Sequence, residues 1–312
     1  MASDLNYGSV ALLLHLDGAE GSKAFIDNSP RPKSVTGATG ATTITTALSK
    51  FGGSSLGLNA FDKALDIPSS TDFDLGDTYT VELWAYTTLR YPTGGVVTRG
   101  VYDIQGTTWS GLTFGIRARG AFFRFYFYGT SSADEQYIDI TGCCPQNTWQ
   151  HIAMVRSGTN GAVYLDGVLA GSITGLNTPA ASTKPLHIGT LDLLWNGSPA
   201  NECFGDNIDE VRITKGVARY MANFAVPTEA FPDSAPAPSI SGKIRDDTGA
   251  PCSRIVRAYR RDTGALVGST TSDATTGAYT LTVTAATEVT VVVLDDAAGS
   301  TYNDMALRAV PA

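Results

Sequence analysis

The sequence predicts an all-β protein with two domains, and three observations lead to this fold class. Aromatic and β-branched residues gather in short runs, and turn-forming Gly, Asn and Asp residues separate these runs. No segment of ten or more residues repeats its apolar positions with the period of a helix. The chain has 312 residues, 43% of them hydrophobic, which is enough for two folded cores. Many short strands joined by Gly-rich turns are typical of a sandwich or a barrel.

In the first 230 residues, alternation predicts the strands. One face of segment 79–86 is apolar, and two packed sheets would bury it. The other face mixes aromatic and polar side chains, so we expect another segment to cover it or a ligand to bind it. The apolar face holds Val81, Leu83 and Ala85, and the other face holds Thr80, Glu82, Trp84 and Tyr86. Strands are thus predicted at Val81–Tyr86 within this segment and at Phe122–Tyr128, Ile152–Val155 and Val163–Leu165, with a type I′ hairpin turn at Asp166-Gly167.

A proline-rich segment at residues 226–239 marks a domain boundary, because its four prolines cannot donate ladder hydrogen bonds and favour extended geometry. We therefore expect a first domain at 1–232, a semi-rigid linker at 233–239 and a second domain at 240–312. The second domain reads as a small sandwich of five to seven strands. Its predicted strands are Ile240–Arg245, Ile255–Arg260, Leu266–Thr271, Tyr279–Val283 and Val289–Leu294.

Charge and composition exclude several classes of function. The net charge of −8 argues against nucleic acid or an anionic membrane surface as the main partner. No run of 18 apolar residues could span a membrane. The early apolar stretch Val10–Leu14 is too short for a signal-peptide core, so we expect synthesis in the cytoplasm. We expect the four cysteines to be reduced thiols, with a disulfide from Cys143 or Cys144 to Cys203 as the alternative.

Five blocks of the first domain resemble the concanavalin A-like, laminin-G-like jelly-roll family. They read LLLHLDGAEGSKAFIDNSP, SKFGGSSLGLN, YTVELWAYTT, NTWQHIAMVRSGTNGAVYLDGVLAGS and FGDNIDEVRITKGVARYMANFAVPTEAFP. The blocks follow the order of that family and span most of residues 8–232. The resemblance implies a large antiparallel jelly-roll sandwich, often with carbohydrate or protein partners. The version of this domain found in bacteriophage virion proteins is also similar.

The second domain is similar to the carboxypeptidase-regulatory, transthyretin-like module. The patterns G-x-I-x-D…G-x-P and T-S-D-x-x-T-G-x-Y-x-L carry this resemblance. Its closing residues Tyr302–Asp304 and Val310-Pro311 resemble the ends of phage tail and fibre proteins. Such modules are spacers or docking units, and Tyr279 is expected to be a buried aromatic residue with a bonded hydroxyl.

The sequence gives no catalytic pattern. Relatives of the jelly roll that cleave β-glucans place carboxylates on one strand as E-x-D-x-x-E, and no such pattern occurs here. Residues 53–57 match G-x-S-x-G, but a nucleophile elbow needs a following helix, and residues 58–60 have no helix pattern. We therefore expect no enzyme activity and no catalytic residues.

A structural Ca²⁺ site is the one metal site predicted. Asp17, Asp27 and Asp209 lie in the first and last blocks, which are neighbours in a jelly roll, and hard carboxylate oxygens suit Ca²⁺. Members of the family bind Ca²⁺ at about this place. The alternative is that the aspartates are ordinary turn residues that cap local backbone.

Aromatic residues on both faces of Phe122–Tyr128 indicate one core face and one face that is covered, solvated or in contact with a partner. We expect this strand to be the patch through which copies of the chain associate. Trp149 is expected to anchor the core or a sheet edge rather than form a sugar platform. His151 and His187 are expected to be satisfied strand residues, and His15 has no predicted role.

Together these observations predict a non-enzymatic virion structural protein of a bacteriophage, from a tail fibre, a tail tip or a capsid decoration. Its lectin-like domain would contact the host surface or the particle, with other virion proteins and a host-surface glycan as partners and several copies on the particle. The first alternative is a bacterial extracellular carbohydrate-binding or adhesin module at the cell surface. The second is a glycan-degrading enzyme.

Overall fold

The computed structural model describes the chain except residues 1–2, 39–40, 59–62, 91, 104–107, 132–133, 180, 196–197, 200–201, 247, 284–287, 295–304, 310 and 312. The chain divides into two compact units, Met1–Ala235 and Pro236–Ala312. Almost all regular structure in the described residues is strand, and the exceptions are two short 3₁₀ helices, η1 (Tyr7–Ser9) and η2 (Thr71–Phe73). The predicted all-β class is confirmed.

The larger unit contains an eight-stranded antiparallel sheet. Its order is β13-β12-β11-β6-β18-β4-β3, and β1 also pairs with β18. The strands are β1 (Val10–Leu14), β3 (Thr43–Thr45), β4 (Ser55–Gly57), β6 (Thr78–Tyr86), β11 (Gln150–Ser157), β12 (Asn160–Leu165), β13 (Val168–Ile173) and β18 (Asn207–Lys215). The pairing of β1 with β18 confirms that the first and last strands of the jelly roll are neighbours.

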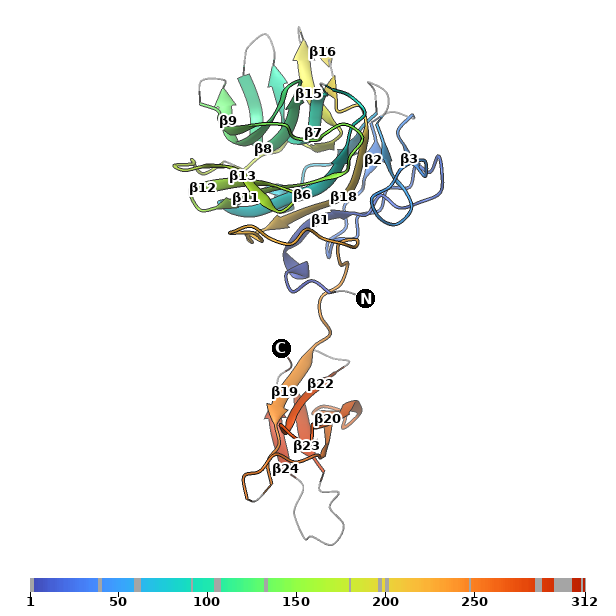
Figure 1. Ribbon diagram of the computed structural model, residues 1–312, viewed down its shortest axis with the longest axis vertical. Coiled ribbons are helices and arrows are strands. Elements are labelled where there is room, and N and C mark those ends of the chain that lie inside the picture. Colours follow the sequence, from blue (N-terminus) through green and yellow to red (C-terminus); the bar gives the residue numbers. More distant parts are fainter. Residues whose placement is uncertain are drawn as a thin grey trace. The chain divides into compact units, whose positions relative to one another are not determined.

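The second sheet of this unit has ten strands within the described residues. Its main path is β10-β9-β8-β7-β14-β5-β2, with three short strands beside β7. Figure 1 shows β7, β8 and β9 in one layer and β6, β11 and β18 in the other. The strands are β2 (Thr36–Gly37), β5 (Leu65–Ile67), β7 (Thr93–Asp103), β8 (Thr108–Arg119), β9 (Phe122–Ser131), β10 (Gln136–Thr141), β14 (Leu186–Ile188), β15 (Thr190–Trp195), β16 (Ser198–Pro199) and β17 (Glu202–Cys203).

One hydrophobic core fills the space between the two sheets. The predicted apolar face of β6 contributes Val81, Leu83 and Ala85, and all three are fully buried. From the other sheet, β9 contributes Phe123, Phe125 and Phe127. Alternate residues of a strand point to opposite faces, so this core leaves a second, outward face on each sheet.

The predicted hairpin and the predicted non-helical segment are both observed. Leu165 pairs with Val168 across a two-residue turn, and Asp166 and Gly167 have φ of 47° and 76°, as a type I′ turn requires. The G-x-S-x-G segment ends in strand β4 rather than in a helix, and Gly52 and Gly53 form the turn before it with positive φ.

The smaller unit folds as two antiparallel sheets around its own core. A two-stranded sheet pairs β19 (Ser239–Lys243) with β22 (Ala278–Thr282). A four-stranded sheet has the order β21-β20-β23-β24, formed by β21 (Leu266–Thr271), β20 (Ile255–Arg260), β23 (Val289–Val293) and β24 (Met305–Ala309). Alternate residues of β20 and β23, such as Val256, Ala258 and Val291, form this core. The Tyr302–Asp304 segment and Val310, which carry part of the phage resemblance, lie outside the described residues.

Candidate functional site

Residues 216–235, which we call the strap, run across the outward face of the eight-stranded sheet without regular secondary structure. Hydrogen bonds from the backbone fix the strap at intervals. The Gly216 N–H donates to the Thr78 carbonyl, the Phe224 N–H to the Gly167 carbonyl, and the Phe231 N–H to the Glu210 carboxylate. The face that alternation left to a covering segment or a ligand is thus covered by the strap at its centre.

Beneath the strap, Glu82 is the centre of a buried network of charged groups. Its side chain is 0% exposed, and the Arg212 Nε lies 2.9 Å from its Oε1. The Tyr220 hydroxyl donates to Glu82 Oε2 over 2.8 Å, and His151 Nε2 lies 3.3 Å from the same oxygen. The Glu82 carboxylate of β6 therefore links β11, β18 and the strap to one another.

A second carboxylate completes the network from the start of the chain. Asp4 accepts two hydrogen bonds from Arg219, over 3.0 and 2.6 Å, and one from Arg212 over 3.3 Å. Two carboxylates thus balance two guanidinium groups, as a buried cluster requires. The Arg212 guanidinium also lies 4.0 Å from the centre of the Phe231 ring in the strap.

The network shifts the pKa values of its acidic groups downward. Burial alone would raise the pKa of Glu82, but the Arg212 charge, together with His151 and Arg219, outweighs burial and holds this pKa well below its ordinary value. For Asp4, burial is likewise outweighed by the hydrogen bond and charge of Arg219, so its pKa is also lowered. Both groups are held as carboxylates by the fold.

Aromatic side chains continue the contact between strap and sheet. The Tyr220 ring stacks on the Phe224 ring at 3.5 Å between centroids and an angle of 8°. The Tyr164 ring of β12 meets Phe224 edge-on at 5.5 Å. Gly167 lies so close to the strap that a Cβ there would overlap the Phe224 carbonyl. The position of Tyr220 is thus fixed twice, by its ring and by its hydroxyl.

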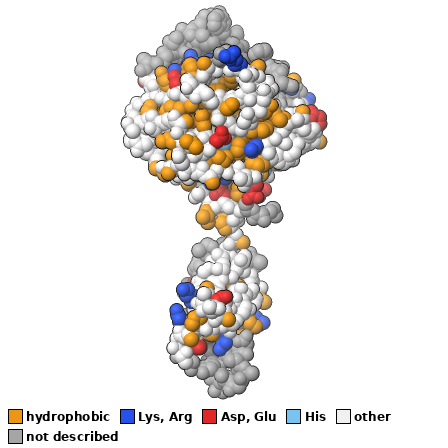
Figure 2. Space-filling view, viewed as in Figure 1, with side chains coloured by type: hydrophobic (Ala, Val, Ile, Leu, Met, Phe, Trp, Pro, Cys, Tyr) orange, Lys and Arg blue, Asp and Glu red, His pale blue; other side chains and the backbone are white. Residues whose placement is uncertain are grey.

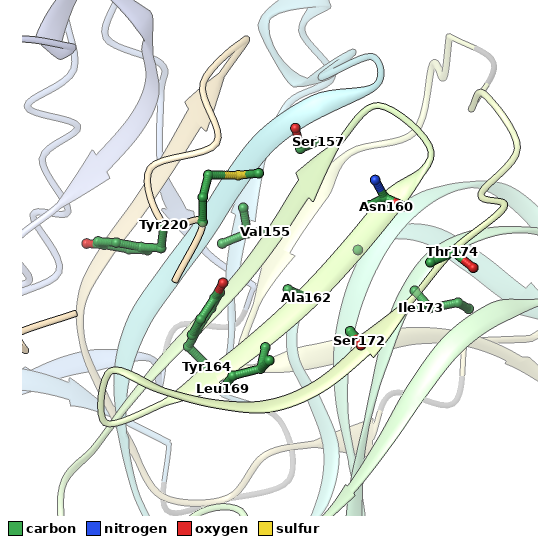
Figure 3. A pocket seen from close by; sticks show the side chains of 12 residues that line it. Val155, Ser157, Asn160, Ala162, Tyr164, Leu169, Ser172, Ile173, Thr174 and Tyr220 are labelled. Carbon is green, nitrogen blue, oxygen red and sulfur yellow. The ribbon is translucent and has the colours of Figure 1, made fainter. Parts of the chain in front are cut away.

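A shallow pocket of about 270 Å³, which we call the outer pocket, opens between the strap and the β12–β13 hairpin. Tyr164 and Tyr220 form its aromatic part, and Met221 at its edge is 70% exposed. Figure 3 shows Ser157, Asn160, Ser172 and Thr174 placing hydroxyl and amide groups around it. An apolar floor with a few polar groups at the rim is the composition of a small-molecule site.

The outward face of the other sheet carries a different arrangement, the aromatic–arginine face. Arg124 at its centre binds Asp139 through two hydrogen bonds of 2.8 and 2.9 Å and lies 3.3 Å from Glu135. Its guanidinium lies 3.5 Å from the centre of the Tyr137 ring. The face consists of Arg117, Arg119, Phe122, Arg124, Tyr126, Tyr128 and Tyr137. The prediction that one side of Phe122–Tyr128 faces the core is confirmed, and association through the other side stays a prediction.

The structure brings two of the three predicted calcium ligands together. Asp209 is buried and accepts hydrogen bonds from the Lys50 and Phe51 amides. Burial raises its pKa to about 8, and the nearby charges of Glu210 and Asp17 add to this increase.

The third predicted ligand, Asp27, instead accepts hydrogen bonds from the amides of Leu13, Ser29 and Lys33, as a capping residue does. Across the described part of the chain, no three His, Cys, Asp or Glu side chains form a group that could hold a metal ion. A Ca²⁺ site at Asp17 and Asp209 stays a prediction.

The three histidines have polar or aromatic partners in the structure, and the partner of His15 is one that the sequence did not indicate. His15, which had no predicted role, bonds through Nδ1 to Glu210 at 2.9 Å. Burial would lower its pKa, but the Glu210 carboxylate outweighs burial and raises it. His187 lies 2.7 Å from Asp66. His151 packs against the Trp84 ring at 5.2 Å, within the network.

Cys143, Cys144 and Cys252 are free thiols, so neither alternative disulfide partner of Cys203 is bridged, and the Cys203 side chain lies outside the described residues. Trp149 packs on Tyr86 at 5.5 Å between ring centroids, in keeping with an anchor at the sheet.

On the face of the larger unit shown in Figure 2, charged side chains lie singly among hydrophobic and uncharged ones. No helix within the described residues is long and apolar enough to cross a membrane.

Sequence reasoning did not find the network or the outer pocket. The signal available was Glu82, the one charged residue of its strand, with Arg212 at an outward position of another strand. A bulge in β18 hides the second part of this signal. Asp209 pairs with Trp84 and Arg212 with Glu82, so three steps on β18 match two on β6, and Glu210 in the bulge has φ of 50°.

Two packed, mainly antiparallel sheets, with the first strand β1 paired to the last strand β18, define a jelly-roll domain of the lectin-like class. The Concanavalin A-like lectin/glucanases superfamily matches residues 59–218, and the chain belongs to this superfamily. The predicted resemblance of the first domain is confirmed. A comparison with curated proteins found no match.

Solved structures with similar folds include three sugar- or receptor-binding domains. Domain 4 of AbnA, an extracellular arabinanase of Geobacillus stearothermophilus, is 16% identical with a TM-score of 0.45 and covers 67% of this chain and 94% of its own. The receptor-binding domain of botulinum neurotoxin type G is 11% identical with a TM-score of 0.47, covering 97% and 79%. The Ruminococcus gnavus sialidase CBM40 domain is 12% identical with a TM-score of 0.39, covering 47% and 80%. At these values the likeness says nothing about a ligand of this chain.

Proposed function

We propose that this chain is a non-enzymatic, lectin-like structural protein of a bacteriophage virion, and that its larger unit binds a glycan in the outer pocket. The observation that carries this proposal is the pocket itself, on a domain of the concanavalin A-like superfamily. Sugars present C–H faces and hydroxyl groups together. Tyr164 and Tyr220 offer aromatic surface to the former, and Asn160 and Ser172 offer hydrogen bonds to the latter.

The chemistry of the pocket favours binding over hydrolysis. Glycosidases place two carboxyl groups on either side of the bond that they cleave. The described residues that line the outer pocket include no Asp and no Glu. The Glu82 carboxylate nearby is fully buried and paired with Arg212, so it is occupied in holding the strap. A host-surface glycan that is held but not cleaved is therefore the ligand we propose.

Blocking the pocket tests the glycan part of the proposal. Ser172 is exposed on β13, so Ser172→Trp fills the pocket without disturbing the core. On a glycan array and in calorimetric titration, this variant should lose binding at least tenfold. Ala170→Trp, equally exposed on the same strand but outside the pocket, is the matched control and should bind as the unaltered chain does. Equal binding by both variants, or no glycan bound by the unaltered chain, would refute the proposal.

The virion part of the proposal rests on the resemblance of both domains to phage modules. The larger unit would present the pocket, and the smaller unit would act as a transthyretin-like spacer or docking module, with copies of the chain on the particle. Mass spectrometry of washed, purified particles should find the chain in stoichiometric amount, and its absence would contradict this role. Limited proteolysis should cut near Ala235, between the two units, and release both as folded fragments.

A bacterial extracellular adhesin or carbohydrate-binding module is the alternative setting for the same pocket. It would keep the glycan binding and the effect of Ser172→Trp. It differs in location, because the chain would be found at the bacterial cell surface and not on particles.

A further inference from the structure

A second pocket, which we call the end pocket, lies at one end of the sandwich and has a volume of about 90 Å³. It is lined by Tyr79 at the start of β6, by Thr113 of β8, and by the loops that carry Leu75 and Pro179. It shares no lining residue with the outer pocket.

Two hydroxyl groups in the end pocket have no hydrogen-bond partner among the described residues. Tyr79 is 1% exposed and Thr113 is 4% exposed, and the Tyr79 hydroxyl and the Thr113 Oγ1 are both buried without a partner. A buried hydroxyl that makes no hydrogen bond destabilises the fold, so a pair of them in one pocket calls for an explanation. Burial raises the pKa of Tyr79, so its hydroxyl keeps its proton and can donate.

Two buried arginines, each paired with a partly exposed aspartate, hold the loops around the pocket. Arg99 of β7 is fully buried and donates to Asp74 over 2.8 Å, and Asp74 also accepts the Ser182 amide over 3.0 Å. The loop before β6 is thereby tied to the loop before β14. The pocket edge at Asp74 is held in place whether or not a ligand is present.

The second pair repeats this arrangement two residues from Leu75. Arg156 of β11, also fully buried, donates to Asp77 over 3.0 Å and to the Asn177 carbonyl over 2.8 Å. Thr178 donates to the other Asp77 oxygen over 3.2 Å. Arginines from both sheets thus fix the loop before β6 and the loop before β14. Because these loops are already ordered, a ligand would lose little binding free energy to ordering them.

We propose that the end pocket binds a neutral polyol, such as one diol segment of a sugar or a molecule of glycerol. Its two free hydroxyls can each donate and accept, as sugar hydroxyls do, and Leu75 and Pro179 provide apolar contact for C–H groups. The volume corresponds to roughly three water molecules at ~30 Å³ each, which matches a short polyol. The Asp74 carboxylate at the rim disfavours an anion. Because Arg99 already balances the charge of Asp74, the described residues that line the pocket offer no unpaired negative charge that would favour a cation either.

Glycerol titration followed by saturation-transfer NMR tests this site. The full chain should bind glycerol with a millimolar Kd. The isosteric variants Tyr79→Phe and Thr113→Val each remove one hydroxyl, and each should weaken binding by about two- to tenfold, the worth of one hydrogen bond. Neither variant should lower the Tm, because neither hydroxyl has a partner in the protein to lose.

Two comparisons make the outcome decisive. Ser172→Trp in the outer pocket should leave glycerol binding unchanged, which separates this proposal from the glycan proposal. Acetate, an anion of similar size, should not compete with glycerol. No saturable glycerol signal, equal binding by both isosteric variants and the unaltered chain, or competition by acetate would each overturn the proposal.

Discussion

Arg212 and Arg124 make nearly the same contacts on the outward faces of two different sheets. Each binds two carboxylates, and each lies on an aromatic ring, at 4.0 Å for Arg212 and 3.5 Å for Arg124. They differ in what covers them. The side chain of Arg212 is 6% exposed and its partner Glu82 is 0% exposed, whereas Arg124 is 14% and its partner Asp139 is 36% exposed. The contacts of an ion pair therefore do not determine how much the pair contributes to the free energy of unfolding. That contribution depends on whether another segment covers the pair and keeps water out.

The largest expected effect follows from removing one buried charge. Arg212→Ala leaves the Glu82 and Asp4 carboxylates buried with one guanidinium between them, so it should lower the free energy of unfolding by about 3–5 kcal/mol. The Arg124 ion pair is partly exposed to water, so Arg124→Ala should lower the free energy of unfolding by only about 1 kcal/mol. Urea unfolding followed by circular dichroism measures both.

A double variant is the control for this comparison. Glu82→Leu combined with Arg212→Met removes one charge of each sign and keeps the Asp4–Arg219 pair, so it should recover most of the loss. Equal costs for Arg212→Ala and Arg124→Ala would show that the strap does not isolate the network from water.

The pH dependence of stability should reveal the same difference. The folded-state pKa values of Glu82 and Asp4 lie below their unfolded values, so their contribution is full above about pH 4.5 and is lost as the pH falls through the folded-state values. Each such group changes the free energy of unfolding by up to about 1.4 kcal/mol per pH unit. Glu82→Gln should flatten the acid limb of the curve measured between pH 7 and 3. A limb of unchanged slope would contradict the role given to Glu82.

The calcium prediction concerns the edge of the covered face. Burial raises the pKa of Asp209, and a cation between Asp17 and Asp209 would remove the charge repulsion that adds to this increase. Binding to the folded state alone stabilises it by about 2.7 kcal/mol at a hundredfold excess over the Kd. EDTA should then lower the Tm, added Ca²⁺ should restore it, and Asp209→Ala should lose the response. Asp27→Ala is the informative control, because Asp27 caps backbone amides and its variant should keep the response. A Tm that chelation does not move would leave these aspartates as capping residues.

The smallest effect on stability is expected on the aromatic–arginine face. Arg119 is exposed beside Phe122, so Arg119→Glu should change the free energy of unfolding by less than about 0.5 kcal/mol. If copies associate through this face, sedimentation should show a shift toward monomer. Lys23→Glu makes the same charge change at another exposed position and should leave association as it was. A shift by both variants would indicate a general charge effect instead.

The sequence was sufficient for the sheets but not for the face that the strap covers. Alternation assigns Val81 and Leu83 to the core and Glu82 to the other side, because the side-chain period of a strand is two. The Asp-Gly pair at 166–167 fixes the hairpin, since only a few residues adopt positive φ.

The partners of Glu82 could not be predicted in this way. They come from strand β18 beyond a bulge, from the strap and from Asp4, and no local pattern shows that these segments meet. The same holds for the outer pocket, whose Tyr220 and Tyr164 are 56 positions apart in the printed sequence.

The strap also has a practical meaning for dividing this protein into parts. The superfamily match ends at residue 218, before Tyr220, Phe224 and Phe231. A gene fragment cut to the matched residues 59–218 would also lack β1, β3 and β4, and so lose the strands that pair with β18 on the side away from β6. Such a fragment would present the charged network and an apolar sheet face to solvent. The smallest expressible piece is therefore set by the strap and by its partner Asp4, and it extends from Asp4 through residue 235.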